Sequence, residues 1–252
     1  MGKDSAPRLL LVAFAVCLVC SVIVSSAAVF LRERQEENRA LFRKEAILRA
    51  ARLYDPSRPV EEQFRRVTPR LLDLSAGWFA PPGVIPSSDQ DQPIPPEKDL
   101  AGIRKRPRYR EIYLVKSGKR VDQVILPVEG KGLWSTMYGF ISLGSDLSTV
   151  TGFGFYQHGE TPGLGGEVDN PRWLSLWPGK RVFDMQGNLR IEVIKGRVDP
   201  ASPGAIHQVD GLSGATLTTR GVHSLLRWWL GDEGYGPFLS RLRMKGGIVD
   251  GQ

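Results

Sequence analysis

Cysteine is nearly absent from this 252-residue chain. Its two cysteines, Cys17 and Cys20, lie inside an apolar run near the N-terminus. A CxxC pair indicates redox or zinc chemistry when it lies in a folded polar context. Inside an apolar run, both are instead expected to be small residues that face lipid or a helix. The rest of the chain therefore has no disulfide and no cysteine-ligated cluster of its own.

Several catalytic and binding motifs are also missing. The sequence has no Walker-type loop, no zinc motif and no Ser/His/Asp order, and His158, His207 and His223 do not have the spacing of metal ligands. Gly163–Gly166 is too short and too isolated for a dinucleotide fingerprint, so we expect that this chain does not bind NADH itself. The net charge of +7 fits a basic surface beside a membrane, because no nucleic-acid motif accompanies it.

One long apolar run is present, from Leu9 to Leu31. At about 23 residues without a charge, it can span a bilayer as a helix. A cleaved signal peptide with Ser25-Ser26-Ala27 as its site is the alternative. The run is longer than a usual signal core and continues into a helix-forming segment without a turn, so we predict a retained single-pass anchor over residues 1–34. Charge does not decide the orientation, because Lys, Arg and Glu are mixed after the run and long domains cross regardless of charge.

The remainder predicts an α+β fold, in which a helical stalk precedes a sheet with packed helices. Helix-forming residues predict a helix from Glu33 to Tyr54 and a second, short helix from Val60 to Leu74, with Pro69 as its weak point. Pro81–Pro96 predicts a linker or surface loop. We assign residues 35–100 to the stalk and Pro-rich linker, and residues 101–252 to the sheet-plus-helix domain. The predicted strands are Tyr109–Val115, Val121–Val128, Tyr138–Leu143, Val150–Tyr156 and Arg190–Ile194. A helix from Thr218 to Leu230, ended by Gly231, follows them.

The segment Val209–Val222 predicts a turn that is rich in hydroxyl groups and leads into a helix. Its hydroxyl residues, which suit a helix start, are Ser213, Thr216, Thr218 and Thr219. Its small residues, which allow another group to approach the backbone, are Gly211, Gly214 and Ala215. A helix start has unpaired N–H groups and a positive dipole end, so it can bind phosphate. Composition alone leaves both an ordinary capped helix and a phosphate site open.

The string D-G-L-S-G-A-T-L-T, Asp210–Thr218, resembles the flavinylation motif D-x-x-[ST]-G-A-[TS]-x-[TS] and matches it at every position. That motif is found in flavin-binding subunits of bacterial respiratory complexes, where the threonine of S-G-A-T is esterified to the FMN phosphate. The resemblance implies a covalent FMN, held as a phosphoester on Thr216, which would make the chain a phosphoprotein. The motif residues expected beside the cofactor are Ser213, Gly214, Ala215, Leu217 and Thr218.

Three further stretches resemble the C subunit of the sodium-translocating NADH:quinone reductase. They are Pro127–Ser135, Gly159–Trp173 and Trp229–Leu239, and the apolar N-terminus with its charged helix is similar too. The resemblance implies a protein that carries electrons on FMN, without complete activity alone, in a membrane complex that oxidises NADH, reduces ubiquinone and exports sodium ions. The basic run Arg104–Arg106 and the Pro-rich linker have no counterpart in this resemblance.

The same resemblance implies a location and partners. The chain would lie in the bacterial inner membrane with its FMN domain on the periplasmic side, beside membrane lipid and the other subunits of a six-subunit complex. A separate flavin transferase, which uses FAD and a divalent metal, would attach the flavin, since a threonine hydroxyl is a poor nucleophile near neutral pH. Asp210 either helps that enzyme or is an ordinary turn carboxylate. No nucleic acid is expected among the partners.

A flavin ring needs a partly apolar slot with backbone donors. The loop Glu160–Gly165 is the best candidate for it. Within this loop the expected contacts are Glu160, Thr161, Gly163 and Leu164. Lys195 either stabilises a reduced anionic flavin or is a surface lysine. Trp134 and Trp173 are either stacking partners of the ring or ordinary core and interface aromatics.

Two other functions remain open at this point. The first is the G subunit of the related electron-transport complex that links ferredoxin and NAD, which shares the flavinylation motif. The K-G-L-W-S stretch and the G-D-E-G-Y-G-P-F stretch favour the sodium-translocating reductase over it. The second is a membrane-anchored flavin-binding sensor without turnover.

Overall fold

Helix α1 runs without a break from Ser5 to Ala50. The computed structural model describes residues 5–118 and 120–245, so the first four residues of the predicted anchor lie outside the described part. Within Pro7–Ala50 an 18-residue window has a mean hydropathy of 2.8, and none of it is buried. By length and composition this fits a membrane anchor. The predicted stalk helix continues α1 and ends at Ala50, because Arg52 takes a left-handed φ of 56°.

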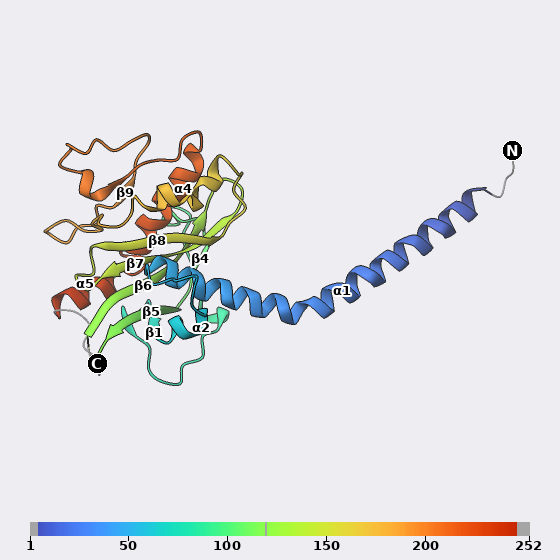
Figure 1. Cartoon of the computed structure of the whole chain (residues 1–252), viewed down its shortest axis with the longest axis horizontal. Coiled ribbons are helices and arrows are strands. Elements are labelled where there is room, and N and C mark those ends of the chain that lie inside the picture. Colours follow the sequence, from blue (N-terminus) through green and yellow to red (C-terminus); the bar gives the residue numbers. More distant parts are fainter. Residues whose placement is uncertain (1–4, 119, 246–252) are drawn as a thin grey trace. The chain divides into compact units, whose positions relative to one another are not determined.

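The chain divides into two units, Met1–Arg43 and Lys44–Gln252. The second unit contains a six-stranded antiparallel sheet in the order β2-β1-β5-β6-β7-β8 (Figure 1). The α+β prediction is confirmed. The strands of this sheet are β1 (Val67–Asp73), β2 (Trp78–Phe79), β5 (Tyr109–Ser117), β6 (Arg120–Lys131), β7 (Thr136–Gly144) and β8 (Val150–Gln157).

Short elements surround the sheet. The remaining strands form two-stranded pairs: β3 (Gln92–Pro93) with β4 (Lys105–Arg106), and β9 (Glu192–Val193) with β10 (Gln208–Val209). The helices are α2 (Val60–Phe64), α3 (Pro171–Leu174), α4 (Thr216–Leu230) and α5 (Gly236–Met244). Three turns of 3-10 helix occupy Ser88–Gln90, Gly165–Asp169 and Ala205–His207.

The helix predicted within Val60–Leu74 is correct only for α2, and it is wrong from Val67 onward. There the chain forms β1, which pairs along its whole length with β5. Val67 and Thr68 are β-branched and favour a strand. Pro69 lacks the N–H that an interior helix position requires, and it is tolerated here because β2 covers only Leu72 and Asp73 of the strand. Strands β1 and β2 thus join the sheet from a region that we had assigned to the stalk and linker.

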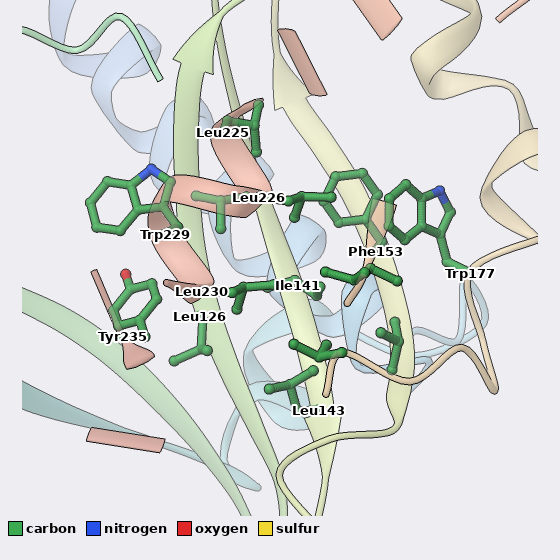
Figure 2. Packing of buried hydrophobic residues seen from close by; sticks show 14 of the residues in the cluster. Leu126, Ile141, Leu143, Phe153, Trp177, Leu225, Leu226, Trp229, Leu230 and Tyr235 are labelled. Carbon is green, nitrogen blue, oxygen red and sulfur yellow. The ribbon is translucent and has the colours of Figure 1, made fainter. Parts of the chain in front are cut away.

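Alternation along the strands sorts the apolar side chains onto two faces of the sheet. On one face, Leu126 of β6 and Ile141 of β7 pack with Leu226 and Trp229 of α4 in the main core (Figure 2). This core also takes in Trp177 and Tyr235, which are both fully buried. Helix α4 is amphipathic and lies on β6, with its apolar face buried in this core. The core therefore fixes where α4 begins.

The opposite face is covered by the end of α1. Ile47 and Leu48 are at most 1% exposed and pack with Tyr113, Ile125 and Phe140 of the sheet. The loop that follows α1 is closed by the amide of Gln63, which bonds the backbone of Asp55 and Arg58. The last two turns of α1 are therefore part of the folded unit that contains the sheet.

Candidate functional site

Thr216 is the first residue of α4, so the helix begins two residues earlier than predicted. Its N-cap residue is Ala215, and within the described residues no side chain caps the helix. Gly214 precedes it with a φ of 74°, a left-handed conformation that glycine adopts without strain. The free N–H groups and the positive dipole end of a 15-residue helix therefore lie at the predicted flavinylation residue.

An open pocket of about 240 Å³ lies beside Thr216. One wall is a single face of α4, where Thr216, Thr219, Arg220 and His223 follow one another at helical spacing. The other wall includes Lys195, which follows β9, and Leu212, which follows β10. The structure thus places Lys195 and Thr216, both candidate site residues, in one pocket. Arg220 and His223 were missed, although their spacing of four and seven residues from Thr216 is a signal for a shared helix face.

The side chains of this pocket make it positive. Lys195 and Arg220 form no ion pair within the described part of the chain. The Nδ1 atom of His223 is buried and finds no hydrogen-bond partner among the described residues. Burial lowers the pKa of His223, and Arg227 lowers it further, while Glu192 opposes both. A pocket with two free cations, an unpartnered ring nitrogen and a helix start is suited to an anion such as a phosphate group.

Glu160 holds the second part of the site together. Its carboxylate is 5% exposed and accepts hydrogen bonds from the backbone N–H groups of Leu133, Trp134 and Ser135, at 3.1, 2.9 and 3.3 Å. It also accepts one from the hydroxyl of Thr218, at 2.5 Å. Burial raises the pKa of this carboxyl, but the four hydrogen bonds outweigh it, so the pKa lies below the ordinary value for glutamate. Glu160 and Thr218 therefore face each other, away from the Thr216 pocket.

The loop that begins at Glu160 reaches the motif through Leu164. The carbonyl of Thr161 accepts hydrogen bonds from the N–H groups of Leu164 and Gly166, at 3.1 and 2.9 Å, and Gly163 takes a φ of 75°. This tight turn leaves Leu164 46% exposed. A Cβ atom built on Gly214 would lie 3.2 Å from the Leu164 side chain, so these two residues are neighbours. Leu217 is 52% exposed and Trp134 is 70% exposed, so apolar surface is also available near the start of α4.

Asp210 and Trp173 have structural contacts. The carboxylate of Asp210 accepts a hydrogen bond from the N–H of Val198 at 2.9 Å, which is the turn role that its position allowed. The indole N–H of Trp173 donates to the backbone carbonyl of Asp210 at 2.8 Å, and Trp173 is 7% exposed. Trp173 is therefore a core residue that fixes the start of the motif.

The histidines outside the pocket also have ordinary partners. His158 contacts Asp169 at 2.6 Å and accepts the N–H of Glu160, while His207 contacts the carbonyl of Arg181 at 2.7 Å. No group of three His, Cys, Asp or Glu side chains suited to a metal occurs in the described part of the chain. His223 is thus the one of the three that stands apart, because its Nδ1 lacks a partner there.

Comparison with protein families places this site in a known class. Residues 132–231 match the family model of the FMN-binding domain, a span that contains both the loop after Glu160 and the start of α4. The chain is therefore a protein with an FMN-binding domain, and its N-terminal helix fits a membrane anchor.

Full-length relatives narrow the class to one family. The chain is 50% identical to the C subunit of the Na(+)-translocating NADH-quinone reductase of Pseudomonas aeruginosa, over 96% of this chain and 98% of that protein. It is 44% identical to the protein of the same name from Yersinia pestis, over 99% and 97%. The crystal structure of Shewanella oneidensis NqrC matches with a TM-score of 0.71 and 33% identity, over 80% of this chain and 96% of that one. The chain belongs to the family formed by the C subunits of Na(+)-translocating NADH-quinone reductases.

Proposed function

We propose that this chain carries electrons on an FMN that is attached through a phosphoester to Thr216, within a membrane complex that oxidises NADH, reduces ubiquinone and exports sodium ions. The observation that carries the proposal is the position of Thr216. It is the first residue of a helix without a side-chain cap, and it lines a pocket with Lys195 and Arg220. A phosphate on its hydroxyl oxygen fits this setting, because the helix start and both cations favour negative charge. FMN supplies the capacity to accept electrons and pass them on.

The flavin ring has a candidate binding site beside the motif, at the loop that begins at Glu160. Leu164 and Leu217 have exposed apolar side chains, and Leu164 lies next to Gly214. The turn at Gly163 places the backbone of the loop beside Leu164. We propose that Thr161, Gly163 and Leu164 contact the ring, while Ser213, Gly214 and Ala215 allow the tethered cofactor to approach. The hydrogen bond from Thr218 to Glu160 links this loop to the first turn of α4. Lys195 supplies positive charge toward the reduced flavin.

The remaining parts of the proposal concern location and partners. Helix α1 would cross the bacterial inner membrane once, in contact with lipid, and the FMN domain would lie on the periplasmic side. The other subunits of the six-subunit reductase would supply NADH oxidation and the sodium path, since no membrane carboxylate is present in the run Leu9–Leu31. A flavin transferase would load Thr216. The near full-length relatives, which carry the name of the sodium-translocating reductase, favour this function over the G subunit of the ferredoxin-linked complex.

The covalent flavin can be tested on a denaturing gel. The full chain is co-expressed with a flavin transferase, and its band is viewed under ultraviolet light. We expect fluorescence from the unsubstituted chain and none from Thr216→Ala. Thr216→Ser, which keeps a hydroxyl group at the same place, is the matched control and should retain some fluorescence. Fluorescence of Thr216→Ala equal to that of the unsubstituted chain would refute the assignment.

The role in the complex needs a separate readout. In membranes that contain all subunits, we expect Thr216→Ala to abolish NADH-dependent quinone reduction while the complex still assembles. Retention of full activity by Thr216→Ala would leave a flavin-binding sensor as the better explanation. The genes that neighbour this one provide a second check, because the proposal requires the other five reductase subunits.

A further inference from the structure

The pocket beside Thr216 extends beyond the flavinylation motif. Arg220 lies four residues after Thr216 and His223 seven residues after it, on the same face of α4. Side chains of a helix tilt toward its N-terminus, so a residue covers the turn that precedes its own Cα. Arg220 and His223 therefore lie one and two turns after Thr216 on the face of α4 that lines the pocket.

The charges around these residues are unbalanced. Lys195 and Arg220 have no ion pair in the described residues, and none of the pocket-lining residues is acidic. Glu192 is near enough to affect His223, but its carboxylate already accepts a hydrogen bond from the amide of Gln208 at 2.6 Å. The buried Nδ1 of His223 is unpartnered within the same part of the chain. Of the four buried polar side-chain atoms without a partner in the described residues, His223 Nδ1 is the one that belongs to a pocket-lining residue.

We propose that Lys195, Arg220 and His223 form an anion subsite that holds the phosphodiester joining the flavin to Thr216. This inference rests on the proposed covalent flavin and adds residues that lie outside the flavinylation motif. The subsite compensates the negative charge of the diester and fixes the first atoms of the tether, so that the flexible ribityl chain starts from one position. Arg220 contributes a permanent charge, whereas His223 contributes a charge that depends on pH.

The titration of His223 gives this subsite a spectroscopic signature. Burial and the charge of Arg227 oppose protonation of His223, Glu192 favours it, and the bound diester would favour it as well; Lys195 and Arg220 are the other charged residues that line the pocket. A phosphodiester has lost the proton that titrates near pH 6 in a monoester, so its own charge is constant over this range. Any pH dependence of its phosphorus-31 resonance between about pH 5 and 8 must therefore come from a neighbouring group.

The experiment uses the full flavinylated chain in dodecyl maltoside and a phosphorus-free buffer. Phosphorus-31 spectra are recorded across this pH range for the unsubstituted chain, His223→Gln and the control His207→Gln, whose histidine lies outside the pocket and contacts Arg181. We expect one titration in the unsubstituted chain and in His207→Gln, and its loss in His223→Gln. We also expect Arg220→Ala to move the resonance toward its position in the urea-unfolded chain, and Arg220→Lys to reverse much of that shift.

The outcomes separate this subsite from the covalent assignment. A flat titration in the unsubstituted chain, or one that persists in His223→Gln, overturns the subsite even when the gel band is fluorescent. A resonance that is the same in Arg220→Ala and in the unsubstituted chain overturns it too. A chain without any fluorescent band overturns the covalent flavin and the subsite together. Loss of the titration in His223→Gln alone, with fluorescence intact, supports both.

Discussion

Three threonines in the first turn of α4 have different surroundings. Thr216 lines the cationic pocket, while Thr218 donates to Glu160 at 2.5 Å. Thr219 accepts the N–H of Leu212 at 3.0 Å and so fixes the turn before the helix. Thr218 and Thr219 therefore fix the start of the helix through their hydrogen bonds, whereas Thr216 lines the pocket without such a bond in the described residues. Structural restraint from Thr218 and Thr219 explains how Thr216 is held in one place.

Removing the charge of Glu160 should lower the free energy of unfolding of the chain. In Glu160→Gln, one carboxylate oxygen becomes an NH2 group, so two of the four hydrogen-bond donors to this side chain lose their acceptor. We expect a loss of about 2–3 kcal/mol in the free energy of unfolding at neutral pH, the range for buried hydrogen bonds to a charged group. Urea unfolding of the full chain in detergent measures it. Glu167→Gln is the control, because Glu167 lies on the same loop and accepts one side-chain bond, from Asn170.

The effect of Glu160 should depend on pH in a defined direction. Its pKa is lower in the folded chain than the ordinary value for glutamate. Such a group contributes its full stability above the unfolded pKa and loses it as the pH falls through the folded pKa. The stability difference between the unsubstituted chain and Glu160→Gln should therefore shrink on acidification. A difference that stays constant from neutral pH to well below the ordinary glutamate pKa would contradict this role.

Comparing Trp173 with Trp177 allows the contribution of one hydrogen bond to the free energy of unfolding to be measured. Trp173→Phe removes the bond from the indole N–H to the Asp210 carbonyl, whereas the indole N–H of Trp177 has no partner among the described residues. Both substitutions remove a similar buried volume. We expect Trp173→Phe to cost about 1 kcal/mol more than Trp177→Phe in urea unfolding, the typical net value of such a bond. Equal costs would show that this bond does not fix the motif.

At the scale of elements, the sequence predicted the helices and strands that short-range residue patterns determine. Strands β5 to β8 followed from alternating apolar residues, and α4 followed from its apolar spacing and from Gly231 at its end. Strand β1 did not, because its short apolar pattern suits a helix as well and only pairing with β5 selects the strand. The pocket was predicted only in part. Thr216 and Lys195 were named as site residues, but Arg220 and His223 were not, although they share the Thr216 face of α4 and lie outside the linear motif.

The close approach of α4 to β6 depends on Gly221. A Cβ at this position would lie 2.5 Å from the carbonyl oxygen of Lys131 and 3.2 Å from the Cα of Gly132. Alanine normally favours a helix over glycine by about 1 kcal/mol. Here we expect Gly221→Ala to destabilise the chain by about 1–3 kcal/mol, because the helix must move off the strand.

This prediction has a matched control in the sheet. Gly154→Ala adds a Cβ where no atom lies within 4 Å and should change the free energy of unfolding little. The shift of α4 in Gly221→Ala should also reduce flavin attachment, since Lys131 and Gly132 lead into the loop that Glu160 holds. Thermal unfolding and gel fluorescence check both effects. A stabilised Gly221→Ala chain would show that helix propensity outweighs the contact.

At the scale of the whole molecule, one continuous helix serves two purposes. The apolar part of α1 fits a membrane anchor, and its last residues fill the second face of the sheet. Hydropathy indicates the first purpose directly. The second was not predicted, because Ile47 and Leu48 were assigned to a stalk separate from the sheet. The end of the N-terminal helix is thus part of the domain that it precedes in sequence.

Two truncations separate these purposes. Deleting residues 1–31 removes the apolar run but keeps Ile47 and Leu48, so the product should leave the membrane fraction and keep the unfolding free energy of the domain. Deleting residues 1–54 also removes both side chains from the sheet. Each contributes about 1.5–3 kcal/mol when fully buried, so we expect this product to lose about 3–6 kcal/mol or to fail to fold. Ultracentrifugation and urea unfolding provide the two measurements, and equal stability of the two products would show that the end of α1 is dispensable. Flavin fluorescence that survives deletion of residues 1–31 but is lost on deletion of residues 1–54 would tie the loading of Thr216 to the integrity of the whole sheet.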